Sequence, residues 1–486
     1  MSSAPQQYGI LGCSSYLPRW RIGRRTISDA IGWSRGMSLS GRGQRSFAHW
    51  DEDSLTMAVE AGRQFVNPDA SPDTLQLAST SLPFADRSNS GLVGEALNLD
   101  SSCRTFDLAG SRRSATTWLA QCLSEANGTH VLLASDCVDA KPGSESEMLL
   151  GHAAAGLMLG PADDKRPLIA HCLASRSMHE DFVDQYRMTD QRFDYRLESR
   201  WIRDAGTRKQ LGSLIREVLK EADKAAPDID FLVVPASDSI CKTIARDNAL
   251  EKAERPSVLE QKVGLCAAAQ STLGLCWVLG RAQPGQLVLV AGLGQGMDVL
   301  LFQVERTDQP AGQSMNIQLD AGELEENYCR YLGLRGLVSI DGGIRAERDN
   351  RTAQSAHYRR HRDLTGFVGG RCKECGQLQY PRTEVCVECR KAGTQVPERM
   401  AQSQGTINSY TEDWLAYTAR PPLIFGSVHF EGGANVTMEF GDFLADEAQV
   451  GMNVKMAFRI KDVDNTRHFR RYFWKPVPVR PDGKDG

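Results

Sequence analysis

The chain lacks the features that mark membrane, secreted or nucleic-acid-binding proteins. Its 57 lysines and arginines stand against 61 acidic residues, so no excess positive charge attracts nucleic acid or anionic membranes. The longest apolar runs, such as residues 286–291, fall far short of the roughly 18 residues that a membrane span needs. Residues 1–8 lack the basic start and apolar core of a signal peptide. We therefore predict a cytoplasmic protein, with neither nucleic acid nor membrane as a partner.

A disulfide framework is also lacking, although the sequence has 13 cysteines. Nine are scattered, mostly among apolar neighbours, and an odd total of this kind indicates a reducing compartment. The other four form two CxxC pairs separated by ten residues: Cys372, Cys375, Cys386 and Cys389. Each CxxC turn places two thiolates on one side of a knuckle, and two knuckles supply a tetrahedral site. We predict one Zn²⁺ per chain, with a structural role because four sulfurs leave no open coordination position.

The first 305 residues show an internal similarity between residues 105–136 and 263–292. Each segment contains a turn of small residues, a helix apolar on nearly every face, a turn with glycine and a buried strand. Two such copies indicate a duplicated α/β fold with a largely parallel sheet. We also predict an amphipathic helix over residues 51–66, because an apolar stripe follows its acidic start.

The remainder of the chain differs from the first 305 residues in composition and sequence pattern. Residues 306–365 form a polar connector, with a helix predicted near 321–331, and residues 366–395 hold the cysteine pairs. In residues 396–480, short strands separated by turn signals predict a small β-barrel, with strands at 423–430, 435–440, 454–460 and 469–474. Residues 351–400 carry ten basic and five acidic residues, a local charge suited to a polyphosphate or to a solvated linker.

Several short motifs in the first 305 residues resemble the thiolase superfamily, in its hydroxymethylglutaryl-CoA synthase and ketoacyl synthase III branch. They are Asp51-Glu-Asp-Ser-Leu-Thr-Met-Ala, Pro83-Phe-Ala-Asp-Arg, Asp107-Leu-Ala-Gly-Ser-Arg-Arg, Gly151-His-Ala-Ala-Ala-Gly and Gly292-Leu-Gly-Gln-Gly. The resemblance implies a duplicated five-layered thiolase-like fold and a homodimer. The last 130 residues or so resemble the zinc ribbon and OB-fold domain that accompanies thiolase-like proteins handling acyl-CoA. The resemblance thus implies a CoA thioester as substrate.

The family uses a nucleophilic cysteine, a histidine and a glutamate or other proton carrier. This sequence has a different residue at each of the corresponding positions. Arg112, or Ser111 if the register slips by one, stands at the cysteine. Ser237 stands near the histidine, and Ser81 stands near the synthase glutamate. The standard acyl-cysteine mechanism therefore cannot be assigned. Cys266, in the equivalent turn of the second half, is predicted to be a buried core residue.

The candidate site residues follow from the matched motifs, from residues 181–187 (DFVDQYR), which resemble a family stretch near the pocket, and from the basic charge of residues 351–400. For catalysis we name Ser111, Arg112, Ser237 and Tyr186, the last as acid or base with a packed side chain as the alternative. For substrate binding we name Arg113, Lys242, Arg359, Arg360 and Arg362, of which the last three would pair with the phosphates of CoA. A second basic cluster, Arg19, Arg21, Arg24 and Arg25, is the competing phosphate anchor. His152 is predicted to be structural.

Three functions remain open. The first is an enzyme that makes or breaks C–C bonds of acyl-CoA by Claisen or aldol chemistry without an acyl-cysteine, since a retro-aldol step needs only an acid/base pair and an oxyanion site. The second is an acyltransferase with a non-cysteine relay. The third is a non-catalytic subunit that binds acyl-CoA and supports a partner thiolase. The sequence specifies neither the acyl chain nor the reaction direction.

Overall fold

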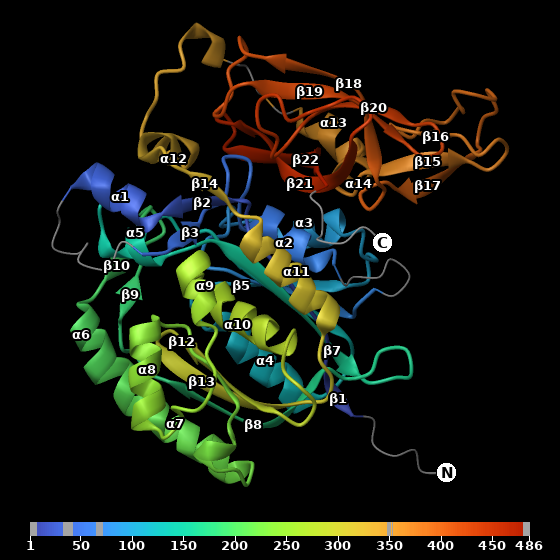
Figure 1. The fold of residues 1–486 in the computed structure, drawn as a ribbon. Helices are drawn as coiled ribbons and strands as arrows, with labels where there is room; N and C mark the ends of the chain where they lie inside the picture. The colour runs from blue at the N-terminus through green and yellow to red at the C-terminus, as the bar shows by residue number, and fades with distance from the viewer. Residues whose placement is uncertain (1–6, 33–41, 65–70, 348–350, 352, 480–486) are drawn as a thin grey trace, which may run out of the picture. The chain divides into compact units, whose positions relative to one another are not determined.

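The computed structural model describes residues 7–32, 42–64, 71–347, 351 and 353–479 (Figure 1). They divide into two compact units, each made of three chain segments. The N-terminal unit comprises Met1–Ala48, Asp53–Gly91 and Asp100–Tyr331, and the C-terminal unit comprises His49–Glu52, Leu92–Leu99 and Leu332–Gly486. No helix among the described residues combines the length and apolar character needed to cross a membrane.

The N-terminal unit is built on one nine-stranded mixed sheet in the order β11-β12-β13-β8-β1-β7-β6-β4-β5. A single pairing, Ile10 with Ala170, joins the halves of the sheet. The strands are β1 (Tyr8–Tyr16), β4 (Thr74–Ala78), β5 (Arg104–Leu108), β6 (His130–Asp136), β7 (Ala153–Pro161), β8 (Ala170–His179), β11 (Phe231–Val233), β12 (Leu287–Leu293) and β13 (Gly296–Val304).

The two halves repeat one topology, which confirms the predicted duplication. In the first half β4 pairs in parallel with β5 and β6, and β7 is antiparallel to β6 and β1. In the second half β11 pairs in parallel with β12, and β13 is antiparallel to β12 and β8. The counterpart of β5 is reduced to one parallel bridge between Phe231 and Glu254.

Helices complete five layers around this sheet (Figure 1). One outer helix covers the first half and another covers the second, while two helices lie between the halves and contact strands of both. All ten residues of the central α10 are buried, which explains its lack of a polar face. The outer helices are α2 (Ser54–Gly62) on the first half and α7 (Arg208–Glu221) on the second. The two helices between the halves are α4 (Ser114–Glu125) and α10 (Gln270–Leu279).

The helix predicted over residues 51–66 begins three residues later than expected, and its last two residues lie outside the described ones. Asp53 caps α2 by accepting hydrogen bonds from the backbone N–H groups of the first turn. Asp51 and Glu52 instead belong to the C-terminal unit, where they pair with Lys475 and Arg459 at 2.9 and 3.3 Å. Burial would raise the pKa of Asp51, but Lys475, His49 and Arg459 together outweigh burial and hold the pKa well below its usual range.

The prediction of a helix near residues 321–331 is wrong for the first part of that range. Gly322 follows the end of α11 (Gln309–Asp320), and the next residues form β14 (Glu323–Glu325), which pairs in parallel with β2 (Trp20–Gly23). A new helix, α12 (Tyr328–Leu334), begins near the end of the predicted range. The backbone hydrogen bonds to β2 here outweigh the helix-forming residue types.

The C-terminal unit contains two antiparallel sheets. The first, of order β16-β15-β17, carries the cysteine pairs, and the second has the order β20-β19-β18-β21-β22. Four strands of the second sheet overlap the four predicted segments. The strands are β15 (Val368–Cys372), β16 (Leu378–Gln379), β17 (Gln395–Arg399), β18 (Gly405–Asp413), β19 (Leu423–Phe430), β20 (Asn435–Glu439), β21 (Asn453–Asp464) and β22 (Phe469–Pro478).

Candidate functional site

The turn before α4 is hydrogen-bonded to the glycine-rich loop between β12 and β13. The Ser111 hydroxyl donates to the Gly294 carbonyl at 2.9 Å, and Arg113 Nε donates to the same oxygen at 3.1 Å. Gly294 has φ +157°, and a Cβ on it would lie 2.8 Å from Ser111 Oγ. The Ser111 hydroxyl is therefore engaged as a donor to a backbone carbonyl, and no histidine is among its hydrogen-bond partners in the described part of the chain.

A buried carboxylate fixes the start of α4 from the second half of the fold. Asp298, on β13, is fully buried and accepts from Arg113 Nη1 at 2.8 Å. The hydroxyls of Thr116 and Thr117 donate to its other oxygen, each at 2.7 Å. The close approach requires glycine at 292, because a Cβ there would lie 1.8 Å from Thr116 Oγ1. Arg113 was predicted to bind substrate, but this ion pair gives it a positioning role.

Arg112, at the position where the resemblance implies a nucleophile, is held by Asp194. Arg112 Nη2 lies 2.5 Å from one Asp194 oxygen, and Arg187 Nη1 lies 2.6 Å from the other. Arg187 also donates to the Thr80 carbonyl, next to Ser81. Arg187 thus links the segments that carry two of the three positions named from the family, those of Arg112 and Ser81.

The Ser81 turn is itself anchored on a second buried carboxylate. Asp136, at the end of β6, is fully buried and accepts from the Ser79, Thr80 and Ser81 hydroxyls at 2.7 to 3.0 Å. It also accepts from the Ala268 N–H in the second half at 2.9 Å. The Ser81 hydroxyl is 3.8 Å from the half-buried thiol of Cys137. Sequence reasoning did not single out that thiol.

The third position is not joined to this cluster by the contacts of the described residues. Ser237 precedes α8 (Asp238–Asp247), and its carbonyl accepts from the Cys241 N–H within that helix. Lys242 is 62% exposed and pairs with Asp238 at 2.7 Å. Roles for Ser237 and Lys242 in the reaction therefore remain predictions without a geometric link to Arg112.

Tyr186 is not the packed side chain considered as the alternative for it. It lies on β9 (Gln185–Tyr186), is half exposed, and contacts the ring of Tyr195 on β10 (Tyr195–Arg196). Its neighbour Asp184 is more enclosed and accepts from Gln295 Nε2 at 2.9 Å. Desolvation raises the pKa of Asp184 above its usual range.

Two further side chains behave as predicted. Cys266 is fully buried, and desolvation raises the pKa of its thiol far above the usual range, so it is a core residue. His152 is also fully buried, and its Nδ1 accepts from the Ala48 N–H at 2.8 Å. Both side chains serve the fold.

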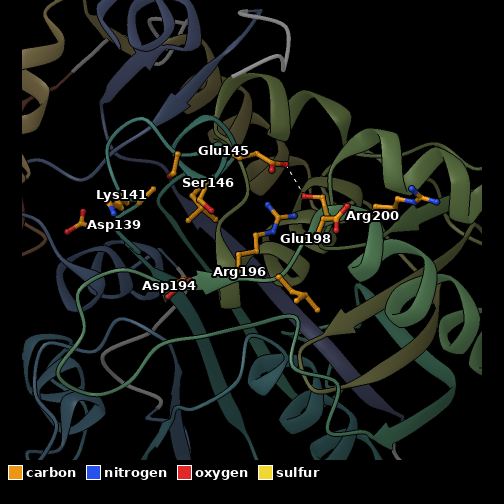
Figure 2. Close-up of a pocket in the computed structure, with 13 residues that line it drawn as sticks. Asp139, Lys141, Glu145, Ser146, Asp194, Arg196, Glu198 and Arg200 are labelled. Carbon is orange, nitrogen blue, oxygen red and sulfur yellow. Dashed lines mark hydrogen bonds between the residues drawn. The ribbon is translucent and has the colours of Figure 1, made fainter. Parts of the chain in front are cut away.

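A cavity of about 490 Å³ opens beside Asp194 (Figure 2). One wall is the loop after β6, and the other is the segment that runs through β10 into α6 (Ser199–Trp201). The lining is strongly charged and consists of Asp139, Ala140, Lys141, Ser144, Glu145, Ser146, Leu150, Asp194, Arg196, Leu197, Glu198, Ser199 and Arg200. Sequence reasoning named none of these residues; the only available signal was the dense charge of residues 190–200 beside a stretch matched to the family.

The basic residues named for the CoA phosphates lie in the C-terminal unit. Arg359 ends α13 (Gln354–Arg359), Arg360 follows it, and both are exposed. Arg362, in α14 (His361–Thr365), is 66% exposed and lies 3.6 Å from Glu95.

The competing cluster near residue 20 is not an exposed phosphate anchor, and that alternative is wrong. Arg21 is fully buried, and Arg24 donates to the Met148 and Glu260 carbonyls. The Arg19 side chain is 7% exposed and lies 3.6 Å from Glu323. Three of the four side chains are therefore used by the fold, and only Arg25 is exposed.

The four cysteines of the CxxC pairs converge on one point. Cys372 Sγ lies 3.7 Å from Cys389 Sγ, Cys375 Sγ lies 3.6 Å from Cys386 Sγ, and all four sulfurs lie within 4.8 Å of one another. Zn–S bonds of about 2.3 Å place tetrahedral sulfurs about 3.8 Å apart. The donor set thus fits Zn²⁺ and would hold together a small sheet with little core of its own.

This geometry predicts that one zinc per chain is lost when a single ligand is removed. Cys386→Ser should abolish zinc retention and expose residues 366–395 to proteolysis, because three sulfurs cannot complete the shell. Elemental analysis after gel filtration measures the metal. Cys329→Ser, which changes an exposed cysteine outside the cluster, is the control and should retain one zinc. Equal zinc in both variants would contradict the assignment.

Comparison with known proteins supports the resemblances predicted for both parts of the chain. Residues 366–394 match the model of the ChsH2 rubredoxin-like zinc ribbon domain. Hydroxymethylglutaryl-CoA synthase of Caldivirga maquilingensis is 24% identical over 69% of this chain and 99% of that protein. The corresponding synthase of Methanopyrus kandleri is 25% identical over 63% of this chain and 90% of its own length.

Solved structures show the same fold at lower identity. A hydroxymethylglutaryl-CoA synthase complexed with CoA matches with a TM-score of 0.60 at 15% identity, covering 72% of this chain and 95% of that one. The 3-oxoacyl-(acyl carrier protein) synthase III of Pseudomonas aeruginosa PAO1 matches with a TM-score of 0.53 at 20% identity, covering 62% and 99%. The chain therefore joins a unit with the thiolase-like fold of hydroxymethylglutaryl-CoA synthases and ketoacyl synthases III to a ChsH2-type zinc ribbon.

Proposed function

We propose that the chain is an enzyme that acts on acyl-CoA thioesters and makes or breaks C–C bonds without an acyl-cysteine. The observation that carries this proposal is the Arg112–Asp194 ion pair at the expected nucleophile position. A guanidinium remains protonated and has no lone pair to attack a thioester. The synthase relatives and the CoA complex of a structural neighbour support the substrate class.

Arg112 is suited to stabilise negative charge on the thioester oxygen. A guanidinium offers five N–H donors, and pairing with Asp194 engages only part of them. Because Asp194 is shared with Arg187, the guanidinium is held in place before substrate arrives. A preorganised donor of this kind is most effective where charge develops in the transition state, as in an enolate.

Asp184 is the proposed acid/base group. In the cleavage direction its carboxylate takes the proton of a β-hydroxyl, the β-carbon becomes a carbonyl, and the Cα–Cβ bond breaks. The electron pair moves to the thioester enolate, which then takes up a proton. The raised pKa of Asp184 suits proton transfer near neutral pH better than that of an exposed aspartate.

Replacing Asp184 should therefore separate chemistry from binding. We expect Asp184→Asn to lower kcat about 10²- to 10⁴-fold with little change in KM. Ser111→Ala, which removes a hydrogen bond to the same β12–β13 loop that Asp184 contacts, should retain turnover. Because the reaction needs the ionised carboxylate, kcat should fall as pH drops through a pKa above the usual aspartate range. Chromatography of the free CoA and acyl products formed from a panel of acyl-CoAs measures the turnover. Full turnover by Asp184→Asn would contradict the role.

A second candidate is an acyltransferase that uses a relocated thiol. Cys137 favours it, because this thiol is half-buried and lies 3.8 Å from the Ser81 hydroxyl. A covalent acyl group on Cys137 would identify this function. Binding of acyl-CoA without turnover would instead favour a non-catalytic subunit that supports a partner thiolase.

We propose the following roles for the C-terminal unit. The zinc is structural, and the exposed Arg359, Arg360 and Arg362 pair with phosphates of CoA. The strands in residues 396–480 form an OB-type barrel, in which β20 and β22 close the ring. The order β20-β19-β18-β21-β22 and the hydrogen bond from the Gly441 N–H to the Pro476 carbonyl at 2.9 Å support this reading.

We also propose a homodimer formed through β5. This strand is the edge of the large sheet, its residues are partly exposed, and Phe106 is 45% exposed. Open edge strands are templates for pairing with another chain. Sedimentation equilibrium at micromolar concentration should give about twice 53.5 kDa. Phe106→Asp should shift the mass toward the monomer, whereas Val463→Asp, at an exposed strand position of the C-terminal unit, should not. A wild-type mass near 53.5 kDa would contradict this proposal.

A further inference from the structure

The four residues before Asp53, residues 49–52, belong to the C-terminal unit, although the chain on both sides of them belongs to the N-terminal unit. Two of the four are buried carboxylates that face cations from β21 and β22. Lys475 Nζ lies 2.9 Å from Asp51, and Arg459 Nη2 lies 3.3 Å from Glu52. We call these two ion pairs the charge clamp. Breaking a buried pair leaves an uncompensated charge, so the clamp fixes the segment firmly.

Further contacts around Lys475 make its position specific. Its ammonium lies 4.5 Å from the centre of the Trp50 ring and 3.7 Å from Glu439 of β20. The Ile460 N–H of β21 donates to the Asp51 carbonyl at 2.8 Å. Because the Lys475 side chain is only 4% exposed, its charge acts on the clamped segment and not on solvent.

The clamped segment leads directly to a side chain that holds the Ser81 turn. Asp53, the next residue, caps α2, and Ser54 is the first residue of that helix. Ser54 is fully buried, and its hydroxyl donates to the Ser81 carbonyl at 2.9 Å. Only Asp53 separates Ser54 from the clamp, so a displacement of residues 49–52 would move the Ser54 hydroxyl.

The same turn is linked to Arg112. Arg187 donates to the Thr80 carbonyl and pairs with Asp194, which also holds Arg112. Displacing a catalytic group by about 1 Å can cost a hundredfold in rate, even where the change is made far from the reacting atoms. A shift of the Ser81 turn would therefore reach the site.

We propose that Lys475 is a positioning residue, which acts through Asp51 on the Ser81 turn. Ser54 makes the connection, and Arg112 is the group at the reacting end that the turn keeps in place. The sheet that carries Lys475 thus takes part in the reaction without touching the substrate. The effect on turnover rests on the proposed function, whereas the effect on the turn rests only on the contacts described above.

The Cys137 thiol reports the position of the turn, because it lies 3.8 Å from the Ser81 hydroxyl. Its modification by iodoacetamide, followed by mass spectrometry of peptides, tests the proposal. Lys475→Met, which removes the ammonium, should speed this modification about tenfold. Lys475→Arg, which keeps the charge, should restore most of the protection. Arg471→Gln, which removes an ion pair with Asp462 between β21 and β22, is the matched control and should behave as the wild type.

Ser54→Ala tests the connection without a change in the C-terminal unit. It should speed the modification of Cys137 about as much as Lys475→Met does, and it should retain one zinc. The double variant should be no faster than either single variant, because changes within one chain of contacts are not additive. Multiplied effects in the double variant would mean two separate losses of stability and would overturn the proposal. Wild-type protection in Ser54→Ala also overturns it, even if Lys475→Met fails to fold.

Turnover separates this proposal from the proposed function. On any acyl-CoA that the wild type converts, Lys475→Met and Ser54→Ala should lower kcat about ten- to a hundredfold with KM unchanged, since neither residue touches the substrate. Full kcat together with faster modification of Cys137 would overturn the role of Lys475 in the reaction. If no variant and no wild-type protein converts an acyl-CoA, faster modification of Cys137 would retain the positioning of the turn and overturn the proposed function.

Discussion

The buried ion pair between Arg113 and Asp298 is the constraint on which the candidate site depends. It crosses between the halves of the duplicated fold, from the start of α4 to β13, and Asp298 has no exposure to water. Removing one partner would leave an uncompensated buried charge, at a cost of about 3–5 kcal/mol. The pair fixes the turn, and the turn fixes where Arg112 meets Asp194. Asp136 likewise fixes the Ser81 turn, and it also accepts a hydrogen bond from the Ala268 N–H in the second half of the fold.

The architecture could be predicted from the sequence because its signals are local and repeated. The small-residue turns followed by apolar helices at residues 105–136 and 263–292 became α4 and α10, which contact strands of both halves. Only α10 is buried on every face, whereas α4 exposes Gln121 and Glu125. The cysteine spacing likewise required only the tetrahedral geometry of four sulfurs. The helix expected near residues 321–331 failed because pairing of β14 with β2 depends on a segment 300 residues away. The placement of Asp51 with Lys475 is non-local in the same way.

The candidate site was predictable only where a motif marked it. The motif match placed Arg112 and Ser81, and the structure links both through Arg187. The match could not reveal Asp194 as the partner of Arg112, because the charged residues of 190–200 read like an exposed surface segment. For a related reason Arg196 was missed, and Asp184 was noted in a matched stretch but given no role. What distinguishes them is desolvation, which depends on elements packed around them and not on residue type.

The central claim is that a fixed arginine, and no thiol, meets the thioester at this site. The intact mass of the protein after incubation with acetyl-CoA, followed by acid quench, tests it most directly. The account predicts an unmodified mass at every time point, because Arg112 cannot accept the acyl group and Cys266 is buried with a raised pKa. A mass increase of one acetyl group that disappears in Cys137→Ser would contradict it and establish a relocated cysteine nucleophile.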